Sequence, residues 1–139
     1  MFDRTSFGRQ LDILHRTMDV SMMRQNVIAN NIANANTPNF KRSEVNFESQ
    51  LRDALGNNNR SGGFQERRTH EGHISFARQT DYRDVRPRRV LDVMSTAKNN
   101  GNNVDIEVES MDLLNNQLMY QLMTRSVADS FARINLVLR

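Results

Sequence analysis

The stretch ANNIANANTPNF, residues 29–40, brings a helix-like pattern to an end amid several asparagines and a proline. Pro38 disfavours the helical region for the residue before it, so a helix that runs into this stretch must end by Thr37. Asparagine is a weak helix former that tolerates the left-handed backbone conformation, and we expect Asn34 or Asn36 to end the helix in that conformation. The stretch therefore predicts a helix terminus, and its other asparagines need a second explanation.

Upstream of this stretch, mostly apolar residues recur in steps of three and four, as they do on one face of a helix. The helix is expected to begin near Thr5 or Ser6, either of which can serve as the N-cap. A second, narrower apolar line lies round the same helix at Ile13, Val20 and Val27. The main face consists of Phe7, Leu11, Leu14, Met18, Ser21, Gln25, Ile28, Ile32 and Ala35.

A second apolar pattern predicts another long helix from about Ser110 to Leu138. A helix that is apolar on several faces is expected to be buried on several sides, and one partner helix of the same chain cannot cover them all. A neighbouring line on this helix consists of Met111, Leu114, Leu118 and Leu122. The main line consists of Leu113, Gln117, Tyr120, Thr124, Val127, Phe131, Ile134 and Leu138.

The residues between the two predicted helices are mostly polar. We expect residues 39–47 to be extended and a short helix to cover about Phe47–Leu55, followed by a flexible loop at 56–63. Residues 69–94 are expected to form short strands or irregular structure. The predicted fold class is mainly α, with a partly extended or short-stranded middle region. We predict one structural unit with an N-terminal helix at 1–38, a polar middle at 39–104 and a C-terminal helix at 105–139.

Composition limits the classes of function. A chain of 139 residues has room for one ordinary domain, yet only 37% of its residues are hydrophobic and none is Trp, which favours an elongated chain or one that completes its core with partners. The net charge is only +3, with cations and anions interspersed, so we expect no nucleic-acid binding. The absence of cysteine excludes disulfides and thiolate chemistry. We also expect no cleavable secretory signal and no membrane-spanning segment.

The candidate chemical motifs are weak, and we expect no catalytic residue, metal site or cofactor. His70 and His73 could form a metal-binding pair, but no further ligand follows at a diagnostic spacing, so we interpret them as solvated loop side chains. The basic run at residues 83–89 favours a solvated loop or a protein contact over phosphate binding. Acidic residues near the start of the second helix are interpreted as stabilising the positive end of its dipole; they are Asp105, Glu107 and Glu109.

The remaining asparagines form a polar line on the first helix. Asn26, Asn30 and Asn34 are each four residues apart and lie roughly opposite the apolar face. Two interpretations stay open from spacing alone. The line can face solvent and end in a cap, or its side-chain amides can donate and accept hydrogen bonds in a lateral contact with a neighbouring subunit.

Two longer segments resemble the signatures of the bacterial flagellar rod and hook axial proteins. IANNIANANTPNFKRSEVNF (28–47) is similar to the N-terminal signature of that family, and NNVDIEVESMDLLNNQLMYQLMT (102–124) is similar to its C-terminal signature. The short chain and FESQLRDAL (47–55) are typical of proximal rod members. Asn39 stands where the family often has glycine. The motif positions implied to act in assembly are Asn26, Asn30, Asn31, Asn34, Asn36, Thr37, Pro38, Phe40, Asn103, Val104, Asp105, Asn116, Gln117, Tyr120 and Gln121.

The resemblance implies a structural, non-enzymatic subunit of the proximal rod of the flagellar basal body. The terminal helices are expected to pair as a coiled-coil-like hairpin and to pack into a helical tube that transmits torque and passes exported subunits. The expected helix seams contain Phe7, Leu11, Leu14, Met18, Ile28, Ile32, Leu113, Leu118, Tyr120, Val127, Phe131 and Ile134. A soluble coiled-coil adaptor is the alternative, but it does not explain the paired signatures.

The resemblance also implies partners and a location. The expected partners are copies of the chain, other rod proteins of the FlgC type, the adaptor FliE, the flagellar export gate and the membrane ring. The expected location is the rod in the periplasmic space, reached through the flagellar type III export channel without a cleaved signal peptide.

Overall fold

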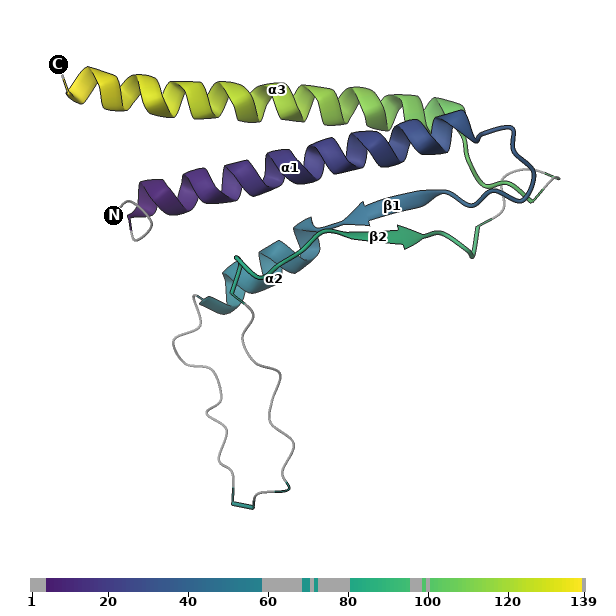
Figure 1. The fold of residues 1–139 in the computed structure, drawn as a ribbon, viewed down its shortest axis with the longest axis horizontal. Coiled ribbons are helices and arrows are strands. Elements are labelled where there is room, and N and C mark those ends of the chain that lie inside the picture. Colours follow the sequence, from purple (N-terminus) through teal and green to yellow (C-terminus); the bar gives the residue numbers. More distant parts are fainter. Residues whose placement is uncertain are drawn as a thin grey trace. The chain divides into compact units, whose positions relative to one another are not determined.

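The computed structural model describes residues 5–58, 69–70, 72, 81–95, 99 and 101–138. The fold is mainly helical, with long N- and C-terminal helices and a two-stranded sheet, which confirms the predicted fold class. The chain divides into two compact units, residues 1–45 with 89–139, and residues 46–88. The elements in chain order are α1 (Ser6–Ala33), β1 (Ser43–Asn46), α2 (Glu48–Asn58), β2 (Arg88–Leu91) and α3 (Ile106–Val137), all shown in Figure 1.

Helix α1 begins as its sequence predicts. Thr5 has extended backbone angles, and its hydroxyl accepts a hydrogen bond from the Gly8 N–H at 3.1 Å, which satisfies one of the unpaired donors of the first turn. The predicted left-handed ending is wrong, because Asn34 caps the helix at φ −102°. Among the described residues, the one non-glycine residue with a positive φ is Asn39, at 60°, so the left-handed turn comes later in the chain.

Helix α3 begins earlier than the apolar pattern predicts, at Ile106 rather than near Ser110. The Asp105 carboxylate accepts a hydrogen bond from the Glu107 N–H at 2.9 Å and so caps the first turn. The apolar pattern misses this turn because its periodic residues begin only at Met111. The cap therefore marks the start of the helix better than hydrophobic periodicity does.

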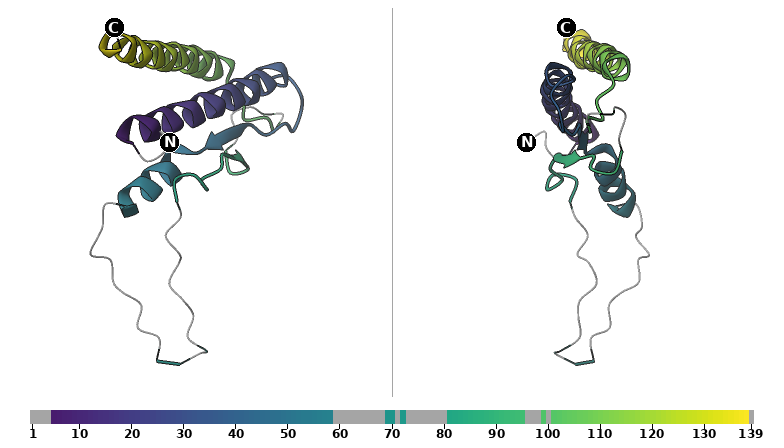
Figure 2. Two further views of the ribbon diagram at one scale, coloured as in Figure 1. Left: turned by 60° about the vertical axis from the view of Figure 1, so that its left-hand side comes forward. Right: turned by 90° about the vertical axis from the view of Figure 1, so that its right-hand side faces the viewer.

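Helices α1 and α3 pack side by side and antiparallel within the first unit, so the predicted hairpin is confirmed (Figures 1 and 2). At its open end, where α1 begins and α3 ends, the rings of Phe7 and Phe131 meet edge to face with centroids 6.3 Å apart. At its closed end, the end of α1 lies near the start of α3 (Figure 1). The hairpin therefore has two distinguishable ends.

The residues predicted to form the helix seams differ in burial. The fully buried apolar positions of α1 are Val20, Val27 and Ile28. Predicted seam residues that are half-buried are Phe7, Leu11, Leu14, Met18, Ile32, Leu113, Tyr120, Val127 and Ile134. Leu118 takes no part in this intrachain seam: it is 50% exposed, because its spacing from Leu114 and Leu122 places it on another face of α3. Phe131 contacts Phe7 and still exposes 48% of its surface.

The middle of the chain contains β1, α2 and β2. Strands β1 and β2 pair in opposite directions (Figure 1). The short helix predicted near Phe47–Leu55 is present as α2, but it continues through Asn58, so the loop predicted at 56–63 is wrong for its first three residues. Residues 59–63, and residues 73–80 of the segment expected to form short strands or irregular structure, lie outside the described residues. Buried apolar residues of the second unit are Phe47, Leu51, Ala54, Tyr82 and Val85.

Candidate functional site

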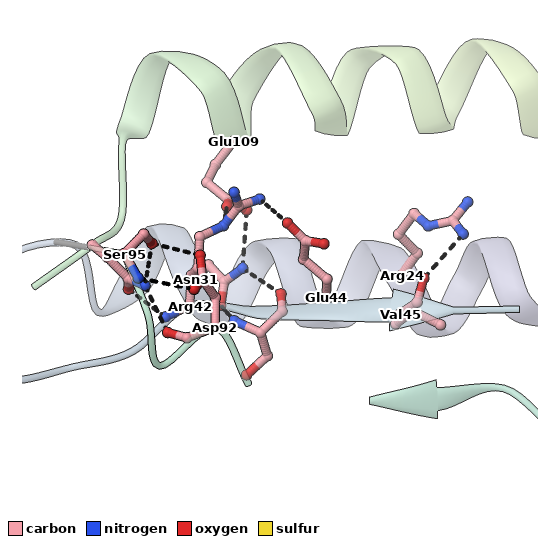
Figure 3. A network of polar contacts seen from close by, with 10 residues as sticks. Arg24, Asn31, Arg42, Glu44, Val45, Asp92, Ser95 and Glu109 are labelled. Carbon is pink, nitrogen blue, oxygen red and sulfur yellow. Dashed lines mark hydrogen bonds and ion pairs between the residues drawn. The ribbon is translucent and has the colours of Figure 1, made fainter. Parts of the chain in front are cut away.

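The two signature segments of the sequence meet at the closed end of the hairpin, where they form a buried polar cluster. We call this cluster the junction and define it by Asn31, Arg42, Ser43, Asn102, Asn103 and Glu109. It connects the end of α1, the start of β1, the segment that precedes α3 and the first turn of α3. Figure 3 shows the polar contacts at this end of the hairpin.

Asn31 is completely buried and uses both ends of its side-chain amide. Its Nδ2 donates to the Ser43 carbonyl oxygen at 2.9 Å and to Oε2 of Glu109 at 3.0 Å. Its Oδ1 accepts a hydrogen bond from the Ser43 N–H at 3.0 Å. An aspartate at this position would have no N–H to donate to the Ser43 and Glu109 oxygens. A leucine would leave both oxygens and the Ser43 N–H without this partner. Asn31 therefore joins α1 to both β1 and α3.

Glu109 carries a carboxylate into this buried cluster, since the residue is only 1% exposed. Its Oε1 lies 3.0 Å from Nε of Arg42, whose Nη2 lies 3.0 Å from Oε1 of Glu44 (Figure 3). A buried carboxylate requires such an ion pair, because removal from water disfavours its charged form. Assigning Glu109 only to the helix dipole is therefore wrong. The first turn of α3 does place it favourably, but its partners lie on other elements.

Asn102 is fully buried and satisfies the carbonyl groups at the end of α1. Its Nδ2 lies within hydrogen-bond distance of three carbonyl oxygens, at 3.1 Å from Asn34, 3.1 Å from Ala35 and 2.9 Å from Thr37. Its Oδ1 accepts from the Val104 N–H at 2.6 Å. The last carbonyls of a helix have no partner within the helix. Asn102 supplies one to the C-cap Asn34 and also contacts the carbonyls of Ala35 and Thr37 in the turn that follows, which stabilises an end of α1 without a left-handed residue.

Asn103 connects β1 to the residues that follow β2. Its Oδ1 accepts from the Arg42 N–H at 2.7 Å, and its Nδ2 donates to the Asp92 carbonyl oxygen at 2.8 Å and to Oγ of Ser95 at 3.0 Å. The Ser95 hydroxyl also donates to Oδ2 of Asp92 at 2.5 Å. This bond, together with the Ser95 and Met94 N–H groups, lowers the pKa of the Asp92 carboxyl below its usual 3.8.

The turn between α1 and β1 packs closely against the segment that precedes α3. Asn39 has φ 60° and Gly101 has φ 78°, and both values lie in the left-handed region. A Cβ atom on Gly101 would lie 2.6 Å from Oδ1 of Asn39. The position where the flagellar family often has glycine is thus a left-handed turn, which asparagine adopts more readily than most residues do.

A second polar contact lies farther along the hairpin. Ser21 donates its hydroxyl hydrogen to Oδ1 of Asn116 at 2.8 Å, and Nδ2 of Asn116 donates to the Ser21 carbonyl oxygen at 2.9 Å. Both residues are buried. This reciprocal pair fixes the register of α3 against α1, because a slip by one residue breaks both hydrogen bonds.

The other predicted motif residues divide between the hairpin and the surface. Val104 is buried, and Asp105 caps α3. Nδ2 of Asn34 donates to the Asn30 carbonyl oxygen at 2.9 Å. Half-buried positions are Asn34, Phe40 and Tyr120, and exposed ones are Asn26, Asn30, Asn36, Thr37, Pro38, Gln117 and Gln121. Whether the exposed side chains act in assembly stays a prediction.

Sequence reasoning missed several polar residues of the hairpin. Ser21 was assigned to an apolar face with no polar role, and the roles of Arg42, Ser43 and Asn102 were not predicted. The available signal was helical spacing, since Glu109 and Asn116 are separated by two turns and share the face that also contains Leu113 and Tyr120. Polar residues in register with an apolar line indicate buried hydrogen bonds.

The described part of the chain contains no group of three His, Asp or Glu side chains that could hold a metal ion. His70 lies on the surface, and its partner in the metal hypothesis, His73, lies outside the described residues. No helix in the described ranges is long and apolar enough to cross a membrane. The contacts that the structure gives for the junction are hydrogen bonds and ion pairs between elements of the fold.

Comparison with known proteins agrees with this structural role. A family model described as "Flagella basal body rod protein" matches residues 21–41, which include Asn31 and the end of α1. The "Flagellar basal body rod protein FlgB" of Borreliella burgdorferi is 47% identical over 133 residues, which cover 96% of this chain and 98% of that protein. The FlgB of Borrelia hermsii is 43% identical with the same coverage, and that of Bacillus subtilis is 28% identical over 95% of each chain.

Proposed function

The chain belongs to the FlgB family of flagellar basal body rod proteins, and on this premise we propose that its helical hairpin packs against neighbouring subunits to build a helical tube. It is a structural subunit of the rod and not an enzyme. The soluble coiled-coil adaptor is not favoured, because the FlgB relatives align with nearly the whole chain. In the tube, the subunits transmit torque and surround the path of exported proteins.

The observation that carries this proposal is an uncovered apolar line on α3. We call it the outer stripe; it consists of Met111, Leu114, Leu118 and Leu122, which are 58%, 51%, 50% and 62% exposed. A helix places these residues on the face opposite Glu109 and Asn116, which point toward α1. An aligned row of exposed apolar side chains marks an interaction surface.

The energetics of the outer stripe also favour a neighbouring subunit. Full burial of a Leu or Met side chain stabilises by about 1.5–3 kcal/mol, so burial of the exposed half of each contributes roughly 1 kcal/mol. Four such residues per subunit give a substantial association energy when the contact repeats around and along a tube. The junction leaves this face free, because Asn31 and Glu109 make their contacts on the other side of α3 within one subunit.

The individual partners are proposed from membership of the family and not from the geometry of the chain. The proposed neighbours are copies of this chain, other rod proteins of the FlgC type and the adaptor FliE, close to the export gate and the membrane ring. The proposed site is the periplasmic rod, reached by flagellar export without a cleaved signal peptide. Co-purification of each partner with basal bodies, before and after cross-linking, tests this list directly.

A single substitution on the outer stripe separates assembly from folding. Leu118→Asp is expected to reduce incorporation into purified basal bodies at least about tenfold, because a charge then replaces an apolar contact. The free energy of unfolding of the isolated chain is expected to change by less than about 0.5 kcal/mol, since half-exposed Leu118 lies outside the intrachain seam. Quantitative immunoblotting and urea denaturation measure the two effects.

Two matched variants serve as controls. Leu118→Met keeps the apolar contact and is expected to assemble like the natural chain, and Asn135→Asp introduces the same charge on another exposed part of α3. Normal incorporation of the Leu118→Asp variant would contradict the proposed role of the outer stripe. Absence of the natural chain from purified basal bodies would contradict membership of the rod itself.

A further inference from the structure

The charges of α3 are separated along its length. Residues 105–112 contain four carboxylates and no Lys or Arg, residues 113–124 contain no charged residue, and residues 125–133 contain Arg125, Asp129 and Arg133. Arg42 neutralises Glu109 inside the junction, while Asp105, Glu107 and Asp112 are exposed. The helix therefore has an acidic start and a weakly basic later segment.

The basic segment borders a groove between α3 and the first half of α1. The groove has a volume of about 340 Å³ and is open to solvent, and Gln10 of α1 and Ser126 of α3 are among the residues that line it together with both arginines and Asp129. Most of its lining is polar. In the part of the chain that the structure describes, neither arginine has an ion pair, although Asp129 lies one helical turn from each.

The helix dipole does not account for the arginines. The favourable effect of a cation is confined to the last turn of a helix, and the last turn of α3 contains no basic residue. Asp112 likewise lies beyond the first turn, where the dipole favours anions. Placement by the dipole explains Glu107 alone among the exposed charges of α3.

The two charged segments cannot neutralise each other within one subunit. Asp112 and Arg125 are separated by thirteen helical steps, which is about 20 Å along the axis. The screening length at physiological ionic strength is about 8 Å, so charges at that separation interact little. Two subunits related by a shift along the helix direction can bring these segments together.

We propose that the groove beside Arg125 and Arg133 receives the acidic start of α3, around Glu107 and Asp112, from a second copy of this chain. The contact joins two different surfaces of the same molecule, so it does not close on itself as a symmetric dimer interface does, and it propagates into an open assembly. This inference rests on the proposed function and adds to it the direction in which subunits meet. Charge complementarity fixes that direction, since an arrangement that places acidic start against acidic start, or basic segment against basic segment, brings like charges together.

Charge reversal on both sides of the contact tests this proposal in the full-length purified chain. The double variants Arg125→Glu/Arg133→Glu and Glu107→Lys/Asp112→Lys are each expected to lower the self-association constant at least about tenfold at low salt, as measured by sedimentation equilibrium. The quadruple variant, which reverses both sides, is expected to restore it to within about threefold of the natural value. Circular dichroism verifies that each variant keeps its helices.

A matched control separates the contact from net charge. Arg52→Glu/Arg86→Glu changes the net charge as much as the first variant does, at exposed positions outside α3, and is expected to leave association unchanged. The proposal is wrong if the quadruple variant associates as weakly as the doubles, if the control has the same effect, or if the natural chain stays monomeric up to about 1 mM. Loss of rod incorporation with unchanged self-association would assign the contact to another protein.

Failure of this inference is distinguishable from failure of the proposed function. If the charge reversals have no effect while Leu118→Asp still prevents incorporation into basal bodies, the rod function stands and the groove contact is wrong. If the natural chain is absent from basal bodies, the rod function itself is wrong, whatever the charge variants do in solution.

Discussion

The junction and the outer stripe of α3 differ in which side chains they bury: the junction buries polar ones, and the outer stripe exposes apolar ones. At the junction, Asn31 and Glu109 are polar yet almost fully buried, and their partners belong to the same chain. On the outer stripe, Leu118 and its neighbours are apolar yet half-exposed. Directional polar contacts therefore shape one subunit, and our proposal assigns the non-directional apolar surface to contacts between subunits.

This division has a physical reason. Hydrogen bonds and ion pairs depend strongly on distance and angle, so the junction can fix the register of the hairpin before any neighbour is present. Apolar contacts depend mainly on the area removed from water, so a stripe of Leu and Met side chains can adapt to different neighbours.

Removal of the buried carboxylate is expected to have the largest effect on folding. Glu109→Ala leaves Arg42 without its buried partner and Asn31 without one of its two acceptors, and we expect the free energy of unfolding to fall by about 3 kcal/mol. Urea denaturation of the isolated chain measures it. Glu107→Ala, at an exposed position in the same turn, is expected to cost less than about 1 kcal/mol. Equal losses for the two variants would mean that the junction contributes nothing beyond helix propensity.

The next largest effect is expected from the asparagine that satisfies the end of α1. Asn102→Ala removes the donor to the Asn34, Ala35 and Thr37 carbonyls, and we expect a loss of about 2 kcal/mol. Asn99→Ala, at an exposed position in the same segment, is the matched control and is expected to be near neutral. Thermal denaturation followed by circular dichroism distinguishes the pair. A near-neutral Asn102→Ala variant would show that Asn102 does not stabilise the end of α1.

A smaller effect is expected at the pair in the middle of the hairpin. Asn116→Ala breaks both hydrogen bonds to Ser21, and we expect a loss of about 1–2 kcal/mol, against little change for the exposed neighbour in Asn115→Ala. A double-mutant cycle with Ser21→Ala is expected to give a coupling energy of at least about 0.5 kcal/mol. Additive losses in that cycle would show that the two side chains do not act together.

The smallest effect is expected at Asp92, on the edge of the junction. The pKa of its carboxyl is lowered mainly by the Ser95 hydroxyl, so Ser95→Ala is expected to raise this pKa toward the usual 3.8. A lowered pKa in the folded state means that the ionised carboxylate favours folding above the unfolded-state pKa, and that this contribution is lost as pH falls through the folded-state pKa. An NMR titration measures it, and a pKa at or above 3.8 in the natural chain would contradict the hydrogen bond.

The sequence alone predicts those parts of the fold that depend on local chemistry. Thr5 caps α1 as expected, and both long helices follow from spacing in steps of three and four, because a cap and an amphipathic face are each encoded within a few residues. The hairpin was expected from the resemblance of the paired signatures, and the structure contains it.

The junction was not predictable in the same way, because its partners lie far apart in the sequence. Among several asparagines in one stretch, spacing does not reveal that Asn31 is the buried one, since its partner Glu109 is 78 residues away. Glu109 also satisfies a simple local explanation, the helix dipole, which conceals its second role. The left-handed residue was misplaced for a related reason: the end of α1 is satisfied by Asn102, which no local pattern near Asn34 indicates.

Hydrogen exchange of the isolated chain, compared with the chain in purified basal bodies, tests the central claim most directly. In the isolated chain, we expect amides near the closed end, at residues 28–33 and 109–116, to exchange at least about 100-fold more slowly than those near the open end, at residues 10–14 and 128–134. In basal bodies, both ends are expected to be slow. Uniform protection of both helices in the isolated chain, or faster exchange at the closed end, would contradict the claim that the buried polar contacts at and near the closed end hold the hairpin together before neighbours bind.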